Sequence, residues 1–92
     1  MTRTTVYDRV RRRDRVCFTC SGRGHEVHHI VPRSLFVKGD TRRDEERNLC
    51  LLCRECHDQA HTRVFRGRLL RKMLDRHDYD YSEAPWRKYF GT

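Results

Sequence analysis

A chain of 92 residues leaves room for one small domain, and a second hydrophobic core would not fit. Only 36% of the residues are hydrophobic and 37% are charged, so a metal or disulfide staple is expected to support so lean a core. The net charge is +8 with a pI near 9.8, and eighteen of the 21 basic residues are arginine. The planar donor fork of arginine matches phosphate, which favours nucleic acid as a partner over a merely soluble cationic surface.

Five cysteines are compatible with a secreted disulfide scaffold. However, the first residues, Met1 to Tyr7, contain no apolar segment typical of a signal peptide, and no run approaches the length needed to span a membrane. In an intracellular chain, paired C-x-x-C spacings indicate zinc ligands rather than disulfides. We therefore expect a cytoplasmic protein with no membrane partner.

Residues 1–16 form a basic amino-terminal segment. Val6 and Val10 lie four residues apart, which predicts a short helix that lays one edge on the domain. A solvated basic arm and a DNA-contacting helix explain the segment equally well. The arginines expected to face water or phosphate are Arg9, Arg11, Arg12, Arg13 and Arg15.

Two C-x-x-C pairs predict a structural metal site. Cys17 and Cys20 begin a zinc knuckle, in which the glycines that follow allow the positive φ that such turns need. Cys53 and Cys56 complete a tetrahedral all-thiolate set that is closed to water. Cys50 forms an overlapping C-x-x-C with Cys53, but it lies in an apolar stretch and suits a small buried hydrophobe better.

Two strands and a loop are predicted between and beside these pairs. Residues 27–31 are mostly β-branched, and Pro32 limits the length of this first strand. The apolar run 49–52 has the length of a second strand, and the charged residues 41–47 are expected to form an exposed loop.

The histidines form a second candidate metal site. Residues 54–62 predict a helix with His57 and His61 on one face, and His28 would be a third ligand from the strand. Three nitrogen ligands leave positions open for water and a phosphate oxygen, which is typical of a catalytic site. His29 would lie beside the ion without binding it. Because adjacent strand residues point to opposite faces, the strand must twist or bend near His29 if both histidines serve one site.

Residues 63–92 predict a helix followed by an aromatic tail. Gly67 is expected to break or restart the helix, and Pro85 argues against one continuous helix in the tail. An apolar stripe at helical period indicates packing on the core rather than a cofactor site. The stripe comprises Leu69, Leu70, Met73 and Leu74, and the tail contains Tyr79, Tyr81, Trp86, Tyr89 and Phe90.

The order of the site residues resembles that of the HNH endonucleases. A histidine pair, then Asn48, then the segment from Cys53 to His61 agree in residue type, order and spacing over about residues 17–61. The resemblance implies an α+β fold, a small ββα-metal (HNH) domain with a four-cysteine zinc knuckle and flanking helices. Residues 1–92 would be a single HNH nuclease domain with its core at about 17–62, flanked by the basic segment 1–16 and by the carboxy-terminal helix and tail at 63–92.

The resemblance also implies residue roles in the hydrolysis of DNA phosphodiester bonds to 5′-phosphate and 3′-hydroxyl ends. His28 would be a metal ligand, His29 the general base, and His57 a further ligand. Asn48 would pin the intervening loop, although a turn asparagine is an equally good interpretation of this residue on its own. His61 matches an extra histidine that is found in colicin-type nucleases.

The two cysteine pairs are similar to those of the zinc-bearing branch that includes small stand-alone phage HNH proteins. Many of these carry aspartate where this chain has His28, whereas the colicin branch has a histidine pair. The expected cofactors are a structural Zn²⁺ and a catalytic divalent ion, with Mg²⁺, Mn²⁺, Ni²⁺ and Zn²⁺ all open. The expected partner is DNA, held mainly through phosphate contacts by arginines; Arg33 is either a phosphate clamp or solvent-facing. A phage packaging protein or another protein partner stays open, and a phage-encoded chain would act in the host cytoplasm.

Two other functions are weighed against the nuclease. A non-catalytic zinc-dependent nucleic-acid-binding module would need the cysteines and arginines but not His28, His29 and His61 together. A zinc protease has the H-x-x-x-H helical spacing of His57 and His61, but its motif requires glutamate after the first histidine, and Asp58 stands there.

Overall fold

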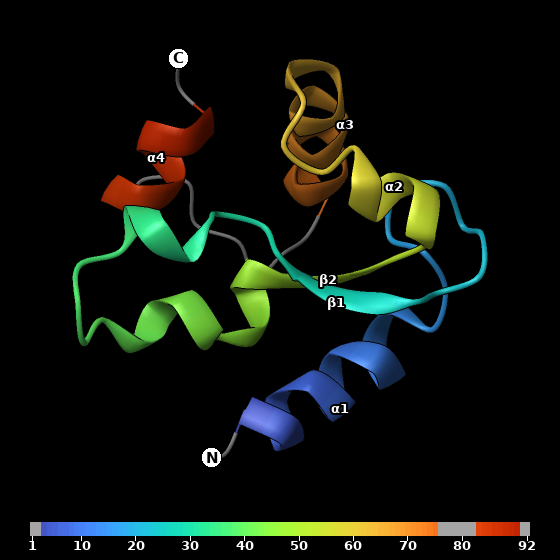
Figure 1. Ribbon diagram of the computed structural model, residues 1–92, viewed down its shortest axis with the longest axis horizontal. Helices are drawn as coiled ribbons and strands as arrows, with labels where there is room; N and C mark the ends of the chain where they lie inside the picture. The colour runs from blue at the N-terminus through green and yellow to red at the C-terminus, as the bar shows by residue number, and fades with distance from the viewer. Residues whose placement is uncertain (1–2, 76–82, 91–92) are drawn as a thin grey trace.

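Two short antiparallel strands lie at the centre of the protein (Figure 1). The computed structural model describes residues 3–75 and 83–90, and in this part of the chain β1 (Glu26–His29) pairs with β2 (Leu49–Leu52). The register places His28 opposite Cys50 and His29 opposite Leu49. The second strand has the predicted bounds. The first begins one residue earlier than predicted and ends before Ile30 and Val31, which are buried beyond its end.

Helix α1 (Arg3–Asp14) covers one face of the sheet (Figure 1). Val6 and Val10 pack against Leu49, as their four-residue spacing predicts, because side chains one turn apart lie on the same edge of a helix. At the end of the helix, a carboxylate oxygen of Asp14 accepts a hydrogen bond from the Leu51 amide at 2.9 Å. This contact satisfies a backbone donor of the sheet and fixes where the helix ends.

Helices α2 (Arg54–Asp58) and α3 (Arg63–Leu74) cover the other face. The helix predicted at 54–62 is therefore wrong in its second half. Thr62 caps α3 by accepting a hydrogen bond from the Phe65 amide, and its extended backbone requires the chain to leave the helix beforehand. His61 lies in the intervening turn.

The third helix runs through Gly67, so the predicted break at this residue is wrong as well. Glycine in a helix costs about 1 kcal/mol, and the burial of Phe65, Leu69 and Met73 in the main core outweighs this. Leu70 is only half-buried, and the side chain of Leu74 lies outside the described set.

The segment between the strands is more ordered than the exposed loop that was predicted. It contains three short 3₁₀ turns, Arg33–Leu35, Thr41–Asp44 and Glu46–Asn48. Arg42 and Arg47 are half-buried because both donate hydrogen bonds to Glu83, which precedes the last helix.

Helix α4 (Ala84–Phe90) packs beside this segment (Figure 1). Trp86 is fully buried in a second cluster with Val31, Phe36 and Tyr89. Pro85 lies in the first turn of the helix, where its missing N–H removes no intrahelical bond. The predicted tail residues Tyr79 and Tyr81 lie outside the described residues.

These elements make an α+β fold in which two strands are followed by the helix α2, with further helices on both sides. Within residues 3–75 and 83–90, no helix combines the length and the apolar character that crossing a membrane would require.

Candidate functional site

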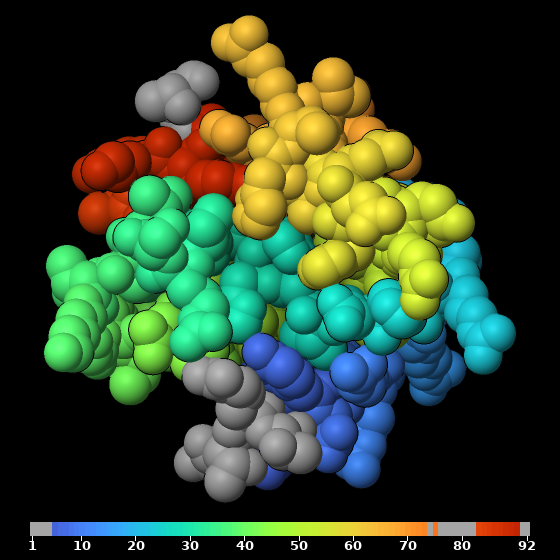
Figure 2. Space-filling view, viewed as in Figure 1, coloured from blue at the N-terminus to red at the C-terminus, as the bar shows by residue number. Residues whose placement is uncertain are grey.

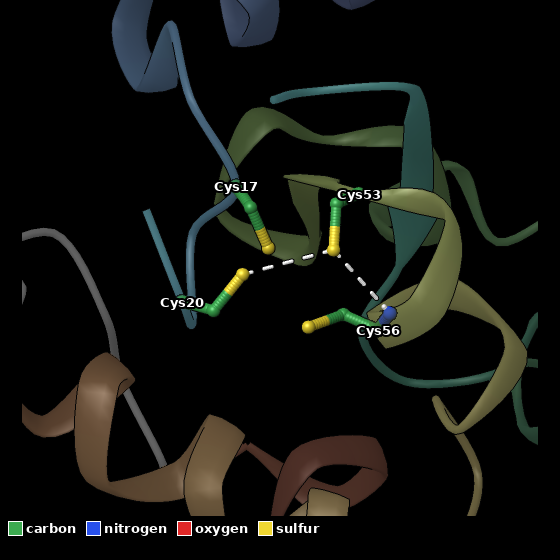
Figure 3. A group of neighbouring side chains, drawn as sticks. All are labelled: Cys17, Cys20, Cys53 and Cys56. Carbon is green, nitrogen blue, oxygen red and sulfur yellow. Dashed lines mark hydrogen bonds between the residues drawn. The ribbon is translucent and has the colours of Figure 1, made fainter. Parts of the chain in front are cut away.

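The four predicted cysteines meet at the start of α2 (Figure 3). Their Sγ atoms all lie within 4.8 Å of one another, and all but Cys20 are buried. Cys53 is the amino-terminal cap of α2 and Cys56 lies in its first turn, while Cys17 and Cys20 come from the turn after α1. The described part of the chain contains all five cysteines, and none forms a disulfide. The cluster is suited to a zinc ion, which four thiolates bind in a closed tetrahedral site.

The knuckle turn uses a different residue from the one expected. Ser21 adopts the positive φ of 65°, whereas neither Gly22 nor Gly24 does. Gly24 is instead required by packing, because a Cβ atom there would collide with the Leu51 side chain. Glycine after the first cysteine pair was therefore correctly associated with the knuckle, but for the wrong physical reason.

Cys17 and Cys50 have contrasting surroundings. Burial opposes ionisation of Cys17, but hydrogen bonding with Thr19 and with backbone groups lowers its pKa to about 6. The Cys17 thiol therefore ionises near neutral pH. Cys50 points from β2 into the main core and takes no part in the cluster. The structure thus separates the overlapping C-x-x-C motifs as the apolar setting of Cys50 indicates.

Three histidines approach one another on the face of the sheet that carries α2. The ring centroid of His28 lies 5.5 Å from that of His57 and 5.1 Å from that of His61. Burial, followed by the nearby histidines, lowers the pKa of His28 to about 3, so its ring is neutral. Its buried Nε2 atom has no hydrogen-bond partner among the described residues. This neutral ring nitrogen therefore offers a lone pair to the hollow.

The other two histidines each contact a polar group. His57 Nε2 lies 3.5 Å from a carboxylate oxygen of Glu26, which precedes His28 by two residues on the same face of β1. His61 Nδ1 lies 3.3 Å from the hydroxyl of Tyr89 on α4. Burial lowers the pKa of His61 as well.

His29 points to the opposite face of β1, toward α1. Its ring meets that of Tyr7 edge-on at 6.3 Å, and its Nε2 atom lies 2.8 Å from a carboxylate oxygen of Asp44. The strand therefore alternates in the ordinary way, and the twist expected near His29 is not needed. Both histidines nevertheless border one shallow hollow of about 240 Å³, together with His57, His61 and Arg33.

Asp44 was not singled out from the sequence. It belongs to the charged run 41–47, where its neighbours made it resemble a solvent-exposed residue. Asp44 ends the 3₁₀ turn Thr41–Asp44, and no local spacing in the sequence relates it to His29, which lies 15 residues earlier.

Asn48 is fully buried and joins the two ends of the inter-strand segment. Its Oδ1 accepts a hydrogen bond from the Val31 amide at 2.9 Å, and its Nδ2 donates to the carbonyls of Val31 and Arg43. The side chain therefore ties the end of β1 to the residue next to Asp44, and with it the position of the His29–Asp44 pair.

The basic segment does not behave uniformly. Arg13 is exposed as expected, but its guanidinium also donates hydrogen bonds to the carbonyls of Glu46 and Leu49 and to Asp14. Arg9 pairs with Glu46 at the surface. The other exposed arginines of the amino-terminal segment are Arg11, Arg12 and Arg15. Outside this segment, Arg33 is exposed at the rim of the hollow.

The ligand groups form one tight set and one loose set. Among the described residues, the four cysteines are the group of three or more His, Cys, Asp or Glu whose ligand atoms all lie within 4.8 Å. The three expected histidine ligands do not form such a group, although the rings of His57 and His61 both lie close to that of His28. The space-filling view shows the segment of β1 exposed between α1 and α2 (Figure 2).

Comparison with known proteins gives one match. Residues 16–63, just over half of the chain, match the family model described as HNH endonuclease. Searches of curated proteins and of solved structures returned no match. The matched range begins before the first cysteine and ends after His61, so it contains the cysteine cluster and the four histidines of the hollow.

Proposed function

The chain belongs to the HNH endonuclease family, and on this premise we propose that it is a metal-dependent endonuclease that hydrolyses phosphodiester bonds in DNA. The observation that carries the proposal is the meeting of four histidines around one hollow: His28, His29, His57 and His61. A protein that only bound nucleic acid would have no use for this arrangement.

A divalent ion is proposed to bind among His28, His57 and His61. The unpartnered, buried Nε2 atom of His28 fits this role, because a neutral imidazole offers a lone pair and a ligand would satisfy it. Imidazole donors favour zinc or nickel over magnesium, which prefers oxygen. An ion held there would neutralise charge on the phosphodiester and stabilise the leaving 3′ oxygen.

His29 is proposed as the general base. The ionised carboxylate of Asp44 can only accept a hydrogen bond, so Nε2 of His29 carries the proton of their contact. The lone pair then resides on Nδ1, which is the atom that would take a proton from the attacking water. Asp44 would also stabilise the imidazolium that forms.

Asn48 and Arg33 are proposed to act beside this pair. Asn48 fixes the segment that carries Asp44, through its bonds to Val31 and Arg43. Arg33 is exposed at the rim of the hollow and is placed to donate to a phosphate oxygen. The exposed arginines of the amino-terminal helix would add phosphate contacts that position DNA without reading its sequence. The thiol cluster fits a reducing compartment such as the cytoplasm.

The alternatives explain fewer of these contacts. A non-catalytic zinc module accounts for the cysteines and the arginines but not for the His29–Asp44 pair or the unpartnered nitrogen of His28. A zinc protease needs two histidines on one helical face, and His61 lies outside α2.

The test is cleavage of supercoiled plasmid by zinc-loaded protein, with and without added Mn²⁺ or Ni²⁺, together with binding to a short duplex. We expect cleavage that depends on the added ion. His57→Ala should bind the duplex normally and stay inactive at any DNA concentration. Loss of binding in proportion to activity would make the metal a docking element and favour the binding module.

A further inference from the structure

The carboxy-terminal helix α4 lies outside the residues that match the family, yet it contacts the proposed site. At its start, Glu83 accepts hydrogen bonds from Arg42 and Arg47. The Arg47 guanidinium also stacks on the ring of Trp86 at 4.4 Å. These contacts fasten α4 to the segment between the strands, so the helix has a defined position on the core.

The far end of α4 brings Tyr89 to His61. The Tyr89 ring is buried, and the Arg66 guanidinium lies 4.6 Å from its centroid while donating to its backbone carbonyl. Arg66 therefore contacts both the ring and the backbone of Tyr89. Its hydroxyl lies 3.3 Å from His61 Nδ1.

His61 needs such a partner because the local chain does not orient it. His57 lies on α2, whereas His61 is an exposed residue in the turn between α2 and α3. A metal-binding imidazole generally donates its other N–H to a neighbouring oxygen, which fixes both the tautomer and the direction of the ring. A tyrosine hydroxyl can accept that bond while keeping its own proton.

We propose that Tyr89 is a positioning residue for the metal site: its hydroxyl oxygen accepts a hydrogen bond from Nδ1–H of His61, which leaves Nε2 as the metal-binding nitrogen. This inference rests on the proposed function, because it assumes that His61 is a ligand. It assigns a role to the aromatic carboxy-terminal helix, which thereby becomes part of the active site.

The test uses Tyr89→Phe, which removes the hydroxyl and keeps the ring, its burial, its stacking with Arg66 and the Arg66 bond to the backbone carbonyl. Zinc-loaded protein is titrated with Ni²⁺ by calorimetry, and zinc content and thermal unfolding are recorded beforehand. We expect unchanged zinc content, a similar melting temperature and a Ni²⁺ dissociation constant raised about 10-fold or more, as for other partners of metal-binding histidines. Tyr7→Phe removes a hydroxyl on the opposite face and should leave the Ni²⁺ affinity unchanged.

A double-mutant cycle separates this role from general support of the fold. If Tyr89 acts through His61, Tyr89→Phe should lower Ni²⁺ affinity no further in a His61→Ala background. An equal loss in both backgrounds, or an affinity within twofold of wild type for Tyr89→Phe alone, would overturn the proposal. Cleavage by Tyr89→Phe should recover at saturating Ni²⁺, whereas His29→Ala should bind Ni²⁺ normally and stay slow in cleavage at every Ni²⁺ concentration.

The same measurements distinguish failure of this inference from failure of the proposed function. Wild-type protein that binds Ni²⁺ with the Tyr89 dependence but cleaves no DNA would overturn the nuclease and leave the positioning role established. If zinc-loaded wild-type protein binds no Ni²⁺, both the positioning role of Tyr89 and the proposed histidine metal site are overturned.

Discussion

The cysteine cluster and the histidine hollow both gather metal-type ligands, but they are built in opposite ways. The cysteines come from two tight turns, and backbone amides of Gly22 and Cys56 donate to sulfur within the cluster. The histidines come from a strand, a helix and a turn, border an open hollow, and depend on side chains from elsewhere in the chain. The cluster therefore organises itself and the surrounding fold, whereas the hollow keeps its geometry only while the fold is intact.

Removing a cysteine of the cluster should have the largest effect. Structural zinc contributes about 10–16 kcal/mol of apparent binding energy in small domains, and this lean core cannot replace it. We expect Cys56→Ser to lose zinc and to unfold at ordinary temperatures, as measured by metal analysis and circular dichroism. Cys50→Ser is the matched control, and it should keep zinc and lose only modest stability. If Cys50→Ser loses zinc and Cys56→Ser retains it, Cys50 rather than Cys56 is the zinc ligand that pairs with Cys53.

His29→Ala tests the other side of the comparison. The fold, the zinc content and duplex binding should remain close to wild type, because the His29 side chain lines the hollow and is not part of the buried core. Single-turnover cleavage should fall by about 10²- to 10⁴-fold, the usual contribution of a general base. A folded variant that cleaves near the wild-type rate would exclude His29 as the base.

Asp44→Asn should give a smaller loss of cleavage. The amide can donate to His29 Nε2 and so favour the wrong tautomer, while the buried bonds of Asn48 keep the loop in place. We expect about a 10- to 100-fold fall in turnover with little change in KM, because the base is misoriented rather than removed. In a His29→Ala background the substitution should have no further effect, and an additive loss would separate Asp44 from the base.

The comparison also explains what could be read from the sequence. Spacing rules are local, so they located the cysteine pairs, the strand Leu49–Leu52 and the buried edge formed by Val6 and Val10. The partners of the histidines come from distant segments. Asp44 is 15 residues from His29 and Tyr89 is 28 residues from His61, and no periodicity relates them.

Errors along the chain have the same origin. A helical histidine spacing predicted one helix through His61, but the cap formed by Thr62 for the next helix ended it early. Gly67 was expected to break α3, but long-range burial of Leu69 and Met73 overrode its low propensity. Local signals that compete with tertiary packing were thus the least reliable.

The smallest effects should come from two neighbouring arginines that the sequence does not distinguish. Both are exposed, but the Arg13 guanidinium is hydrogen-bonded to the carbonyls of Glu46 and Leu49 and so helps to hold the fold. Arg13→Ala should lower the melting temperature by a few degrees, since it removes the part-buried hydrogen bond to the Leu49 carbonyl. Arg12→Ala should leave the melting temperature unchanged.

Binding to a duplex should show the reverse order. If Arg12 neutralises a phosphate, its removal releases one fewer counterion and should flatten the salt dependence of log K by about 0.9. The loss should be the same for different duplex sequences, because phosphate contacts carry no base information, and saturating DNA should restore wild-type turnover. Affinity titrations at several salt concentrations, together with thermal melts of both variants, measure the two effects on the same preparations. An unchanged salt slope in Arg12→Ala would place the DNA away from α1 and leave Arg33, at the rim of the hollow, as the arginine to substitute next.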